Sequence, residues 1–558
     1  MLLVAANLVA VGFLIGYLQG GAETRAGDTS SGNEAALGLD GESLRAQGGA
    51  DFAATDPARA LAAEAPAPTS SRRGSASAGP LDAVLTQRIE SHVAKAVAEA
   101  NKRSKGKVTG ANTVVAVRVW DPAGDRELVA RQADRALRPA SNMKLVTSAA
   151  ALVALGASGE FETRFDTTAE LAGGVLQGDL VVHAGGDPLY DPAAEGEVRQ
   201  LLAPVVAQLR EAGVREITGD LILDQGSYLD PGPAPGWPPS NQYWQEHCAL
   251  SGGFSANGGC LTAVVRAGKN GAEAFSEVRP RENGLKRIGS VKTVSAKARL
   301  DIAVGATAAK ATLRGSIPSS VDRWSSRFAH PDPVGLFGTC LRDALEAGGI
   351  RVRGAVLQRR GLPNGRMLAL LRTPIADTLA PINAESNNAV ADQLFLMLGD
   401  RVAGAGTREG GRRATEAALK RLGVSITGLE QVDGSGLSRE DRVTARQLTA
   451  LLDGVLELDP ATRDAFVDSL AVAGKSGSLE KRMRGTTAQG RVFAKTGWIR
   501  GTSALAGYAD TPGGRRLAFS ILVDYPDVSG LNTHAWKPMQ DAICVELCEW
   551  KSSGGVVR

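Results

Sequence analysis

The chain has 558 residues, which is too long for one hydrophobic core and predicts two or three packed units. Hydrophobic residues make up 43% and charged residues 22% of the sequence, as in soluble globular proteins. The formal net charge of +3 is small for this length and gives no support to nucleic-acid binding. Neither the five histidines nor the five cysteines show metal-ligand spacing, so we expect no metal and no cofactor.

The first residues form an apolar segment. Residues 2–18 contain no charge and one strongly polar side chain, Asn7. Such a run, followed by small residues, is typical of a signal peptide or a membrane anchor. No Lys or Arg precedes it, so the usual basic start of a signal peptide is missing. The segment 1–22 therefore predicts export, to the periplasm or the outer face of the cytoplasmic membrane, and leaves cleavage or anchoring open.

Residues 23–79 are rich in Ala, Gly, Ser and Pro and nearly lack aromatic residues. This composition buries too little apolar surface to offset the entropy of ordering the chain. We therefore expect a disordered linker.

The first folded elements follow in quick succession. Residues 81–100 have helical periodicity, and residues 113–120 and 127–130 read as two strands joined by a turn. Residues 141–155 lack Gly and Pro and are largely apolar, which predicts a buried helix.

The end of the chain completes the same unit. Residues 491–496, 503–509 and 515–525 predict three strands, and residues 534–550 predict a helix. One antiparallel five-stranded sheet covered by helices uses the elements from both ends. We therefore expect an α/β (α+β) domain formed by residues 80–160 and 385–552.

The middle of the chain contains a weak internal repeat. Residues 209–221 and 345–356 each read as a helix end, a glycine stop and a strand. Between them, residues 298–317 alternate as short strands do. We expect an inserted domain over residues 161–384 with a nested β-rich unit at about 286–330.

The cysteines divide by their surroundings. Cys248 and Cys260 flank a Gly-rich loop and are candidates for a disulfide in an oxidising compartment. Cys544 and Cys548 lie one helical turn apart and are expected to be packed thiols.

Three short motifs occur in a fixed order. They are S-x-x-K at Ser141–Lys144, S-x-N at Ser386–Asn388 and K-T-G at Lys495–Gly497. Together they supply a serine nucleophile, a lysine base, a second hydroxyl and a cation that can bind a carboxylate. These are the groups that acyl transfer needs when no histidine takes part.

The chemistry requires a specific state of the lysine. Residues i and i+3 share a helix face, so Ser141 and Lys144 should project together. A lysine acts as a base only when burial or a nearby cation destabilises its ammonium form. Lys495 would be that cation if its strand borders the same cleft.

The motif S-x-x-K alone is not specific. It also occurs at Ser104 and at Ser478, in a polar helix end and a Gly-rich loop. Ser141 is the match that begins a long apolar helix, and K-T-G occurs once, on a predicted strand. The joint arrangement therefore carries the prediction.

With these motifs the chain resembles the low-molecular-mass class C penicillin-binding proteins, which are D-alanyl-D-alanine carboxypeptidases and endopeptidases of peptidoglycan. Further similar stretches lie at residues 186–188, 235–237, 381–383, 433–439 and 491–494. The resemblance covers residues 90–550 and implies a penicillin-binding transpeptidase-like fold.

The resemblance implies a role for each residue. Ser141 would form an acyl-enzyme with the penultimate D-alanine of a peptidoglycan stem peptide or cross-link, and β-lactams would acylate it too. The other implied catalytic residues are the base Lys144, the proton relay Ser386, the substrate-binding amide Asn388, and Lys495. Thr496, Gly497 and Trp498 would bind the substrate, with the backbone N–H groups of Ser141 and Trp498 as the oxyanion hole.

Two positions need separate treatment. The family usually carries Thr or Ser where this chain has Trp498, so a hydroxyl near the substrate carboxylate is lost. We expect a weaker or altered preference for a free C-terminal D-alanine, and weak penicillin binding. Asp187 follows two glycines and precedes a proline, which favours a turn residue, and binding of the substrate's diamino-acid side chain is the alternative.

Two other functions remain open. One is another S-x-x-K hydrolase, such as a β-lactamase or an esterase, which the long insertion disfavours. The other is a non-catalytic peptidoglycan-binding protein in which Trp498 blocks the site.

Overall fold

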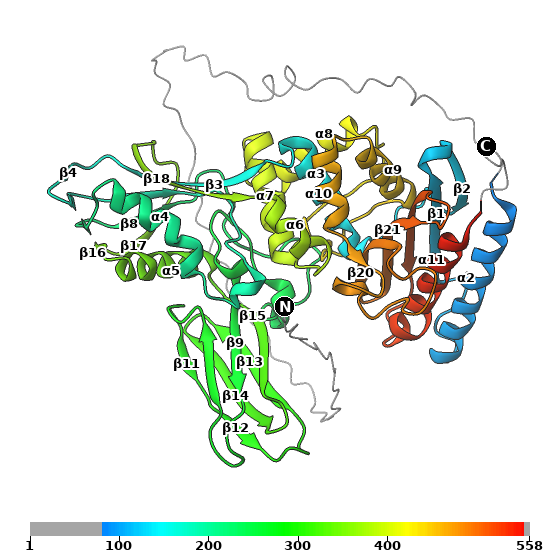
Figure 1. The fold of residues 1–558 in the computed structure, drawn as a ribbon, viewed down its shortest axis with the longest axis horizontal. Helices are drawn as coiled ribbons and strands as arrows, with labels where there is room; N and C mark the ends of the chain where they lie inside the picture. The colour runs from blue at the N-terminus through cyan, green and yellow to red at the C-terminus, as the bar shows by residue number, and fades with distance from the viewer. Residues whose placement is uncertain (1–80, 552–558) are drawn as a thin grey trace, which may run out of the picture. The chain divides into compact units, whose positions relative to one another are not determined.

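The computed structural model describes residues 81–551, so the predicted leader 1–22 and linker 23–79 lie outside the described residues. Within this range no helix is both long and apolar enough to cross a membrane. One group of elements comes from the two ends of the described chain (Figure 1). Its helices are α2 (Ala83–Arg103), α3 (Met143–Leu155), α6 (Ala376–Asn383), α7 (Asn388–Ala403), α8 (Arg408–Arg421), α9 (Ala445–Leu456), α10 (Pro460–Asp468) and α11 (Lys537–Glu549). Its strands are β1 (Val114–Asp121), β2 (Arg126–Arg131), β19 (Ala471–Val472), β20 (Val492–Ile499), β21 (Thr502–Asp510) and β22 (Arg516–Asp524).

These strands form one antiparallel sheet in the order β19-β20-β21-β22-β1-β2. Five of the six strands are those predicted from the sequence, and the sixth is β19. A two-residue strand shows no alternation of its own, so its place at the sheet edge depends on pairing with β20. The predicted antiparallel sheet is confirmed, with one more strand than expected.

The central strand β21 has two buried faces. Ala504, Ala506 and Tyr508 belong to one hydrophobic core, and Leu505 and Ala509 belong to another. Because side chains alternate along a strand, these two sets point to opposite sides of the sheet. The first core includes α3, α7, α8 and α9, and the second includes α2 and α11.

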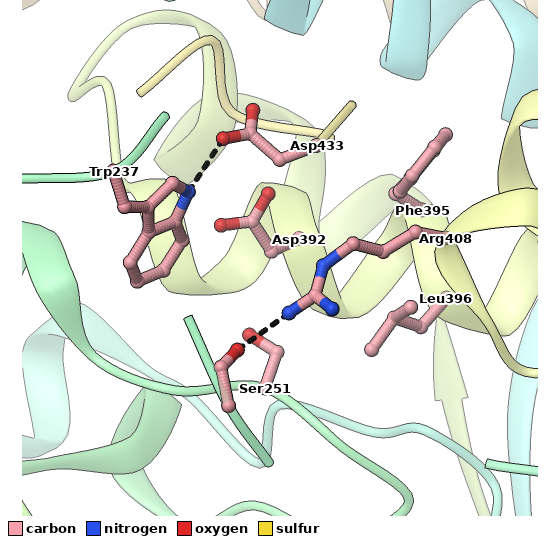
Figure 2. A pocket seen from close by; sticks show the side chains of 8 residues that line it. Trp237, Ser251, Asp392, Phe395, Leu396, Arg408 and Asp433 are labelled. Atoms are coloured by element: carbon pink, nitrogen blue, oxygen red, sulfur yellow. Dashed lines mark hydrogen bonds between the residues drawn. The ribbon is translucent and has the colours of Figure 1, made fainter. Parts of the chain in front are cut away.

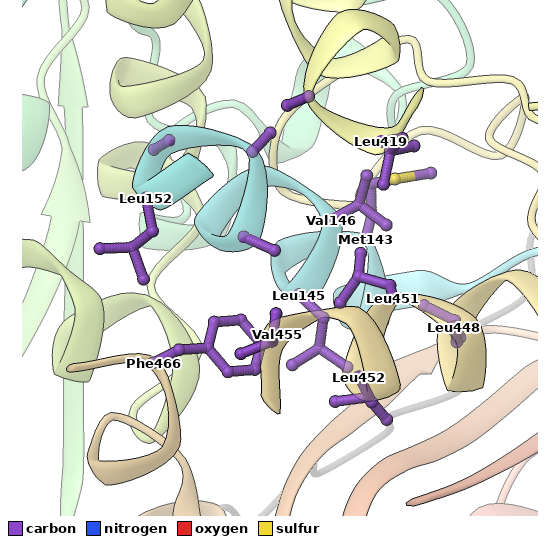
Figure 3. Close-up of a cluster of buried hydrophobic side chains, with 14 of the residues drawn as sticks. Met143, Leu145, Val146, Leu152, Leu419, Leu448, Leu451, Leu452, Val455 and Phe466 are labelled. Carbon is purple, nitrogen blue, oxygen red and sulfur yellow. The ribbon is translucent and has the colours of Figure 1, made fainter. Parts of the chain in front are cut away.

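Helix α3 lies inside the first core. All of its residues from Met143 to Val153 are buried. Figure 3 shows its side chains packed between leucines of α9 and α8, with Phe466 of α10 closing one end. A helix buried on every side has little freedom to shift, because its neighbours fill the space around it. It is therefore a rigid support for the residues at its start.

The elements between residues 160 and 374 form separate sheets. The five-stranded sheet has the order β17-β8-β6-β3-β18, and a four-stranded sheet has the order β16-β7-β5-β4. The bounds are β3 (Glu160–Thr167), β4 (Leu171–Ala172), β5 (Val175–Leu176), β6 (Leu180–His183), α4 (Arg199–Glu211), β7 (Glu216–Ile217), β8 (Leu221–Asp224), α5 (Pro333–Ala347), β16 (Arg351–Val352), β17 (Val356–Arg359) and β18 (Arg366–Pro374).

The internal repeat corresponds to paired strands. Helix α4 leads to β7 and β8, and α5 leads to β16 and β17. Strand β16 pairs in parallel with β7, and β17 pairs in parallel with β8. The two copies therefore lie side by side, as expected for repeated units that share one core.

Two further sheets lie between β8 and α5. One has the order β10-β9-β15, and the other pairs β14 with β11, β12 and β13. The bounds are β9 (Cys260–Arg266), β10 (Phe275–Arg279), β11 (Lys286–Ile288), β12 (Val291–Val294), β13 (Asp301–Thr307), β14 (Lys310–Pro318) and β15 (Arg323–Ala329). The β-rich segment thus begins at Cys260, earlier than the expected residue 286.

All five cysteines are buried free thiols. The disulfide anticipated between Cys248 and Cys260 is not formed. Burial raises the pKa of each of these two thiols to about 12, so neither is a reactive thiolate at neutral pH. Cys544 and Cys548 are packed in the second core, as predicted.

Candidate active site

Ser141 lies in a short 3-10 turn, Ala140–Asn142, directly before α3. The helix itself begins two residues later than predicted. Ala140 has a left-handed backbone with φ of 47°, which is uncommon for a residue with a side chain. Strained backbone of this kind persists where surrounding structure holds it in place, and it is frequent next to reacting groups.

Two glycines hold this turn from opposite sides. A Cβ atom on Gly436 would lie 1.8 Å from the carbonyl oxygen of Ala140. A Cβ atom on Gly497 would lie 2.8 Å from the carbonyl oxygen of Pro139 and 3.2 Å from the amide nitrogen of Ser141. Only glycine fits at either place. The glycine of K-T-G therefore lets strand β20 approach the backbone of the nucleophile.

Lys144 is fully buried and its amine has three acceptors. Its Nζ donates to Asn388 Oδ1 at 2.6 Å, to the carbonyl oxygen of Ser435 at 2.7 Å and to Ser141 Oγ at 3.3 Å. The structure thus joins the S-x-x-K and S-x-N motifs, which are separated by more than 200 residues, at one nitrogen atom. The distance to Ser141 is within reach of a proton transfer.

Burial lowers the pKa of Lys144 to about 8, against the opposing charges of Asp392, Asp433 and Asp441. Burial also lowers the pKa of Lys495 well below its ordinary value, and the charge of Lys144 lowers it further. Loss of hydration, one of the two expected causes, is therefore the main one for Lys144, and the repulsion between the two lysines acts on the pKa of Lys495.

Lys495 lies on β20 with its side chain fully buried, and its Nζ donates to the carbonyl oxygen of Thr496 at 2.9 Å. Asn142 connects this strand to the nucleophile turn. In the amide orientation that satisfies both groups, its nitrogen donates to the carbonyl of Lys495 at 2.8 Å and its oxygen accepts from the N–H of Ala506 at 3.3 Å. Sequence reasoning missed Asn142, because a middle residue of S-x-x-K has no assigned chemistry.

The S-x-N segment connects α6 to α7. Asn387 caps α7 by accepting from the N–H of Val390 at 3.2 Å. Ser386 has φ of 68°, and its hydroxyl makes no hydrogen bond to another residue of the described range. Asn388 donates from Nδ2 to the carbonyl oxygen of His247 at 2.8 Å, so the inserted segment braces the amide that also contacts Lys144. The sequence assigns no role to a histidine, but in the structure the backbone carbonyl of His247 accepts this hydrogen bond from Asn388.

Thr496 lies next to a residue that sequence reasoning had set aside. Its hydroxyl donates to Ser478 Oγ at 2.9 Å, and the N–H of Ser478 donates to the carbonyl of Ala384 at 3.0 Å. Ser478 belongs to the third S-x-x-K match and lies in a loop beside K-T-G. The S-x-x-K match at Ser478 does not predict this hydrogen bond, which is visible only in the fold.

Trp498 has 51% of its surface exposed. Its indole lies near the hydroxyl of Tyr525, whose pKa is raised to about 12 by burial and lowered to a smaller extent by a hydrogen bond with Trp498. The exposed ring is available to a bound ligand at the end of β20.

The turn formed by residues 433–438 supplies the carbonyl that Lys144 contacts. Asp433 Oδ1 accepts from the N–H groups of Ser435 and Gly436, at 3.0 and 2.6 Å. Its Oδ2 accepts from the indole of Trp237 at 2.7 Å and from the N–H of Ser438 at 2.8 Å. This carboxylate therefore fixes the turn, and Figure 2 shows the indole of the inserted segment pointing at it.

Asp392 lies in a cavity beside Asp433, lined also by Trp237, Ser251 and Arg408 (Figure 2). It is buried, and neither of its carboxyl oxygens has a hydrogen-bonding partner of ordinary geometry within residues 81–551. Burial, followed by the charge of Asp433, raises its pKa well above the usual range.

Asp187 is a buried turn residue. Its Oδ1 accepts from the N–H of Leu189 at 2.7 Å and its Oδ2 accepts from the hydroxyl of Thr373 at 2.5 Å. Burial raises the pKa of this carboxyl. Both oxygens are thus occupied, which supports the turn interpretation over contact with a substrate.

The chain is similar in sequence to known D-Ala-D-Ala carboxypeptidases. Residues 94–545 match the model of the D-Ala-D-Ala carboxypeptidase 3 (S13) family. The chain is 35% identical over 464 residues to a D-alanyl-D-alanine carboxypeptidase of Actinomadura sp. (strain R39), covering 78% of this chain and 81% of that protein. It is 26% identical to D-alanyl-D-alanine carboxypeptidase DacB of Haemophilus influenzae, covering 68% of this chain and 79% of that protein.

Solved structures show the same fold. The crystal structure of penicillin-binding protein 4 (dacB) from Haemophilus influenzae matches with a TM-score of 0.65 at 22% identity, and covers 81% of this chain and 98% of that chain. The same protein in complex with a β-lactam matches with a TM-score of 0.61. The fold is therefore that of penicillin-binding proteins, and this chain belongs to the D-Ala-D-Ala carboxypeptidase 3 (S13) family.

Proposed function

We propose that the protein is a serine D-Ala-D-Ala carboxypeptidase and endopeptidase that acts on peptidoglycan peptides. The observation that carries this proposal is the fully buried amine of Lys144, held 3.3 Å from Ser141 Oγ and 2.6 Å from Asn388 Oδ1. A neutral amine at this place can take the proton of the serine hydroxyl, which is the step that a serine nucleophile needs.

In the acylation step, Ser141 Oγ loses its proton to Lys144 Nζ and bonds to the carbonyl carbon of the penultimate D-alanine. The backbone N–H groups of Ser141 and Trp498 donate hydrogen bonds to the negatively charged oxygen that forms on this carbon. The proton on Lys144 Nζ then passes through the hydroxyl of Ser386 to the amine of the terminal D-alanine as the C–N bond breaks, which leaves Lys144 neutral again and Ser386 a hydroxyl. Its lack of another hydrogen bond among the described residues leaves it available for this transfer.

In the hydrolysis step, Lys144 takes a proton from water, and the oxygen of that water attacks the ester carbonyl carbon. As the bond from this carbon to Ser141 Oγ breaks, Lys144 returns the proton to Ser141 Oγ. Lys495 and Thr496 bind the carboxylate of the terminal D-alanine before the first step. Because Lys495 is fully buried and its pKa is lowered, an arriving carboxylate restores its charge and forms an ion pair. Export, to the periplasm or to the outer face of the cytoplasmic membrane, would bring the enzyme to this substrate.

The test is release of D-alanine from a peptide that ends in D-Ala-D-Ala. We expect the wild-type chain to release it and the Ser141→Ala variant to release none above background. Ser104→Ala is the matched control, because Ser104 also starts an S-x-x-K match but is a helix-end residue that contacts Asn101 and Val108.

The same variants separate the alternatives. Rapid turnover of penicillin without release of D-alanine would identify a β-lactamase. No release of D-alanine by the wild type, together with equal binding of peptidoglycan by the wild type and Ser141→Ala, would identify a peptidoglycan-binding protein without catalysis.

A further inference from the structure

The sheet of β11, β12, β13 and β14 has one face that packs inward and one that does not. On β14, Ala311, Leu313 and Ile317 are buried and belong to a hydrophobic core. Because side chains alternate along a strand, Lys310, Thr312, Arg314 and Ser316 point to the opposite face. The cross-strand register then identifies the rest of this outer face.

The outer face is cationic. Lys286 is the partner of Lys310, and Lys292 is the partner of Ser316, so both lie on the same face as Arg314. These four cations are exposed, and none of them forms an ion pair with another residue of the range 81–551. The one carboxylate on this face is Asp301, which is also paired with Ser316.

The charge is concentrated in this part of the chain. Residues 260–329 contain 13 Lys and Arg residues against 5 Asp and Glu residues, a net charge of +8. The whole chain has a net charge of +3, so all other residues together have −5. A charge separation of this size favours an anionic partner at this unit.

The arrangement has a cost in stability. Lys286 and Lys310 are direct cross-strand neighbours on the open face. Like charges at such positions repel each other and destabilise the pair of strands. A single acidic replacement would remove the repulsion, so the pair indicates a use for the cations other than holding the sheet together.

The remaining side chains make the face flat and partly apolar. Thr312 and Ser316 of β14, with Ala303, Gly305 and Thr307 of β13, are small. Ile288, the partner of Thr312, has 36% of its surface exposed. Cations around an apolar side chain on a flat surface match a layer of lipid headgroups, into which the apolar group inserts.

We propose that this outer face, composed of Lys286, Ile288, Lys292, Lys310 and Arg314, binds the anionic surface of a phospholipid membrane. Flatness and the exposed Ile288 favour a membrane over a soluble anionic polymer, because a polymer chain gains nothing from an apolar contact. Binding here does not involve Ser141. The unit would hold the enzyme near the membrane whether or not the predicted leader is cleaved.

The experiment is sedimentation of the full chain with vesicles. We expect binding to vesicles with 30% phosphatidylglycerol in phosphatidylcholine, little binding to pure phosphatidylcholine, and loss of binding in about 1 M salt because charges are then screened within about 3 Å. Lys286→Gln with Lys310→Gln should weaken vesicle binding roughly 30-fold, since each cation contributes about fivefold.

The matched control is Lys420→Gln with Arg421→Gln at the end of α8, which removes the same charge from two exposed residues elsewhere. It should bind vesicles as the wild type does. Asp301→Asn should strengthen binding about fivefold, because it removes the one anion from the face. Ser141→Ala should bind normally, so a failed activity assay and a failed binding assay remain distinguishable.

Lys310→Glu separates binding from folding. It places opposite charges across the strands, so the unfolding temperature should stay equal or rise while vesicle binding falls. Equal binding to neutral and anionic vesicles, equal loss in the control variant, or tight binding of soluble polyphosphate without vesicle binding would each overturn the proposal.

Discussion

At the scale of single residues, the amine of Lys144 combines full burial with three polar contacts. Burial disfavours the ammonium form, the charges of Asp392, Asp433 and Asp441 favour it, and the pKa of about 8 reflects this balance. Burial thus brings the pKa of this lysine closer to neutral pH, and in the proposed mechanism Lys144 is the base.

The first prediction concerns pH. If the neutral form of Lys144 is the base, kcat/KM for D-alanine release should rise about tenfold per pH unit below pH 8 and level off above it. The rate rises with pH because Lys144 must lose its proton to act as a base, and its lowered pKa lets it do so at a lower pH than an ordinary lysine. Measuring the profile from pH 5 to pH 10 checks this, and a rate that is flat from pH 6 to pH 8 would contradict it.

The second prediction concerns Asp392. Its raised pKa means that the folded state holds a proton that the unfolded state loses above about pH 4. The free energy of unfolding of the wild type should therefore fall as pH rises from 4 to 7, and Asp392→Asn should reduce that slope. Urea unfolding at several pH values measures it, with exposed Asp468→Asn as the control. An unchanged slope would show that Asp392 is ionised in the folded state.

The third prediction concerns Trp498. Replacement by Thr restores a hydroxyl at the end of β20, and one hydrogen bond to a charged group contributes about 1.5–3 kcal/mol. Trp498→Thr should therefore raise the rate of acylation by a labelled penicillin about tenfold or more. Trp498→Phe keeps a large ring without a hydroxyl and should not. An equal gain in both variants would assign the effect to the indole rather than to the missing hydroxyl.

At the scale of elements, the nucleophile depends on segments that approach it closely. The turn 433–438 and strand β20 each place a glycine against the residues around Ser141. The helix α3 fixes one side of the turn, and Asn142 joins the other side to β20. The position of Ser141 thus depends on the packing of α3, β20 and the turn 433–438 against one another.

The fourth prediction tests the close packing of the turn 433–438 against the residues around Ser141. Gly436→Ala combines a left-handed backbone, which costs about 1 kcal/mol for alanine, with a contact of 1.8 Å to Ala140. It should destabilise the fold by several times that cost and abolish acylation. Gly428→Ala is the control, since Gly428 has a similar φ of 73° and nothing within 4 Å. Thermal unfolding and acylation should then differ strongly between the two variants, and equal effects would refute the account.

Local pattern was sufficient for the elements with strong signals. The apolar run after Ser141 and the alternating strands near the chain end were visible because each repeats one period over several residues. Strand β19 has two residues, and the contacts of Asn142, His247 and Ser478 depend on where distant segments pack. No local pattern encodes those contacts. Burial was one of the two causes expected for the lowered pKa of Lys144, and the fold was needed to choose between them, because no motif shows how deeply a side chain is buried.

At the scale of the whole molecule, the inserted segments contact residues of the candidate site directly. The carbonyl of His247 braces Asn388, and the indole of Trp237 holds Asp433. Both contacts come from the stretch between β8 and β9, which the sequence showed only as part of a large insertion. The insertion therefore contributes to the geometry of the site. Its outer face on β11, β12, β13 and β14 is the surface that we propose binds a membrane.

The most direct measurement is intact mass after incubation with a penicillin, followed by identification of the modified peptide. The account predicts one added penicilloyl group on Ser141 in the wild type and none in Ser141→Ala, with much slower addition in Lys144→Ala. Acylation at another serine, or unchanged acylation when Lys144 is replaced, would contradict the claim that this lysine activates this hydroxyl.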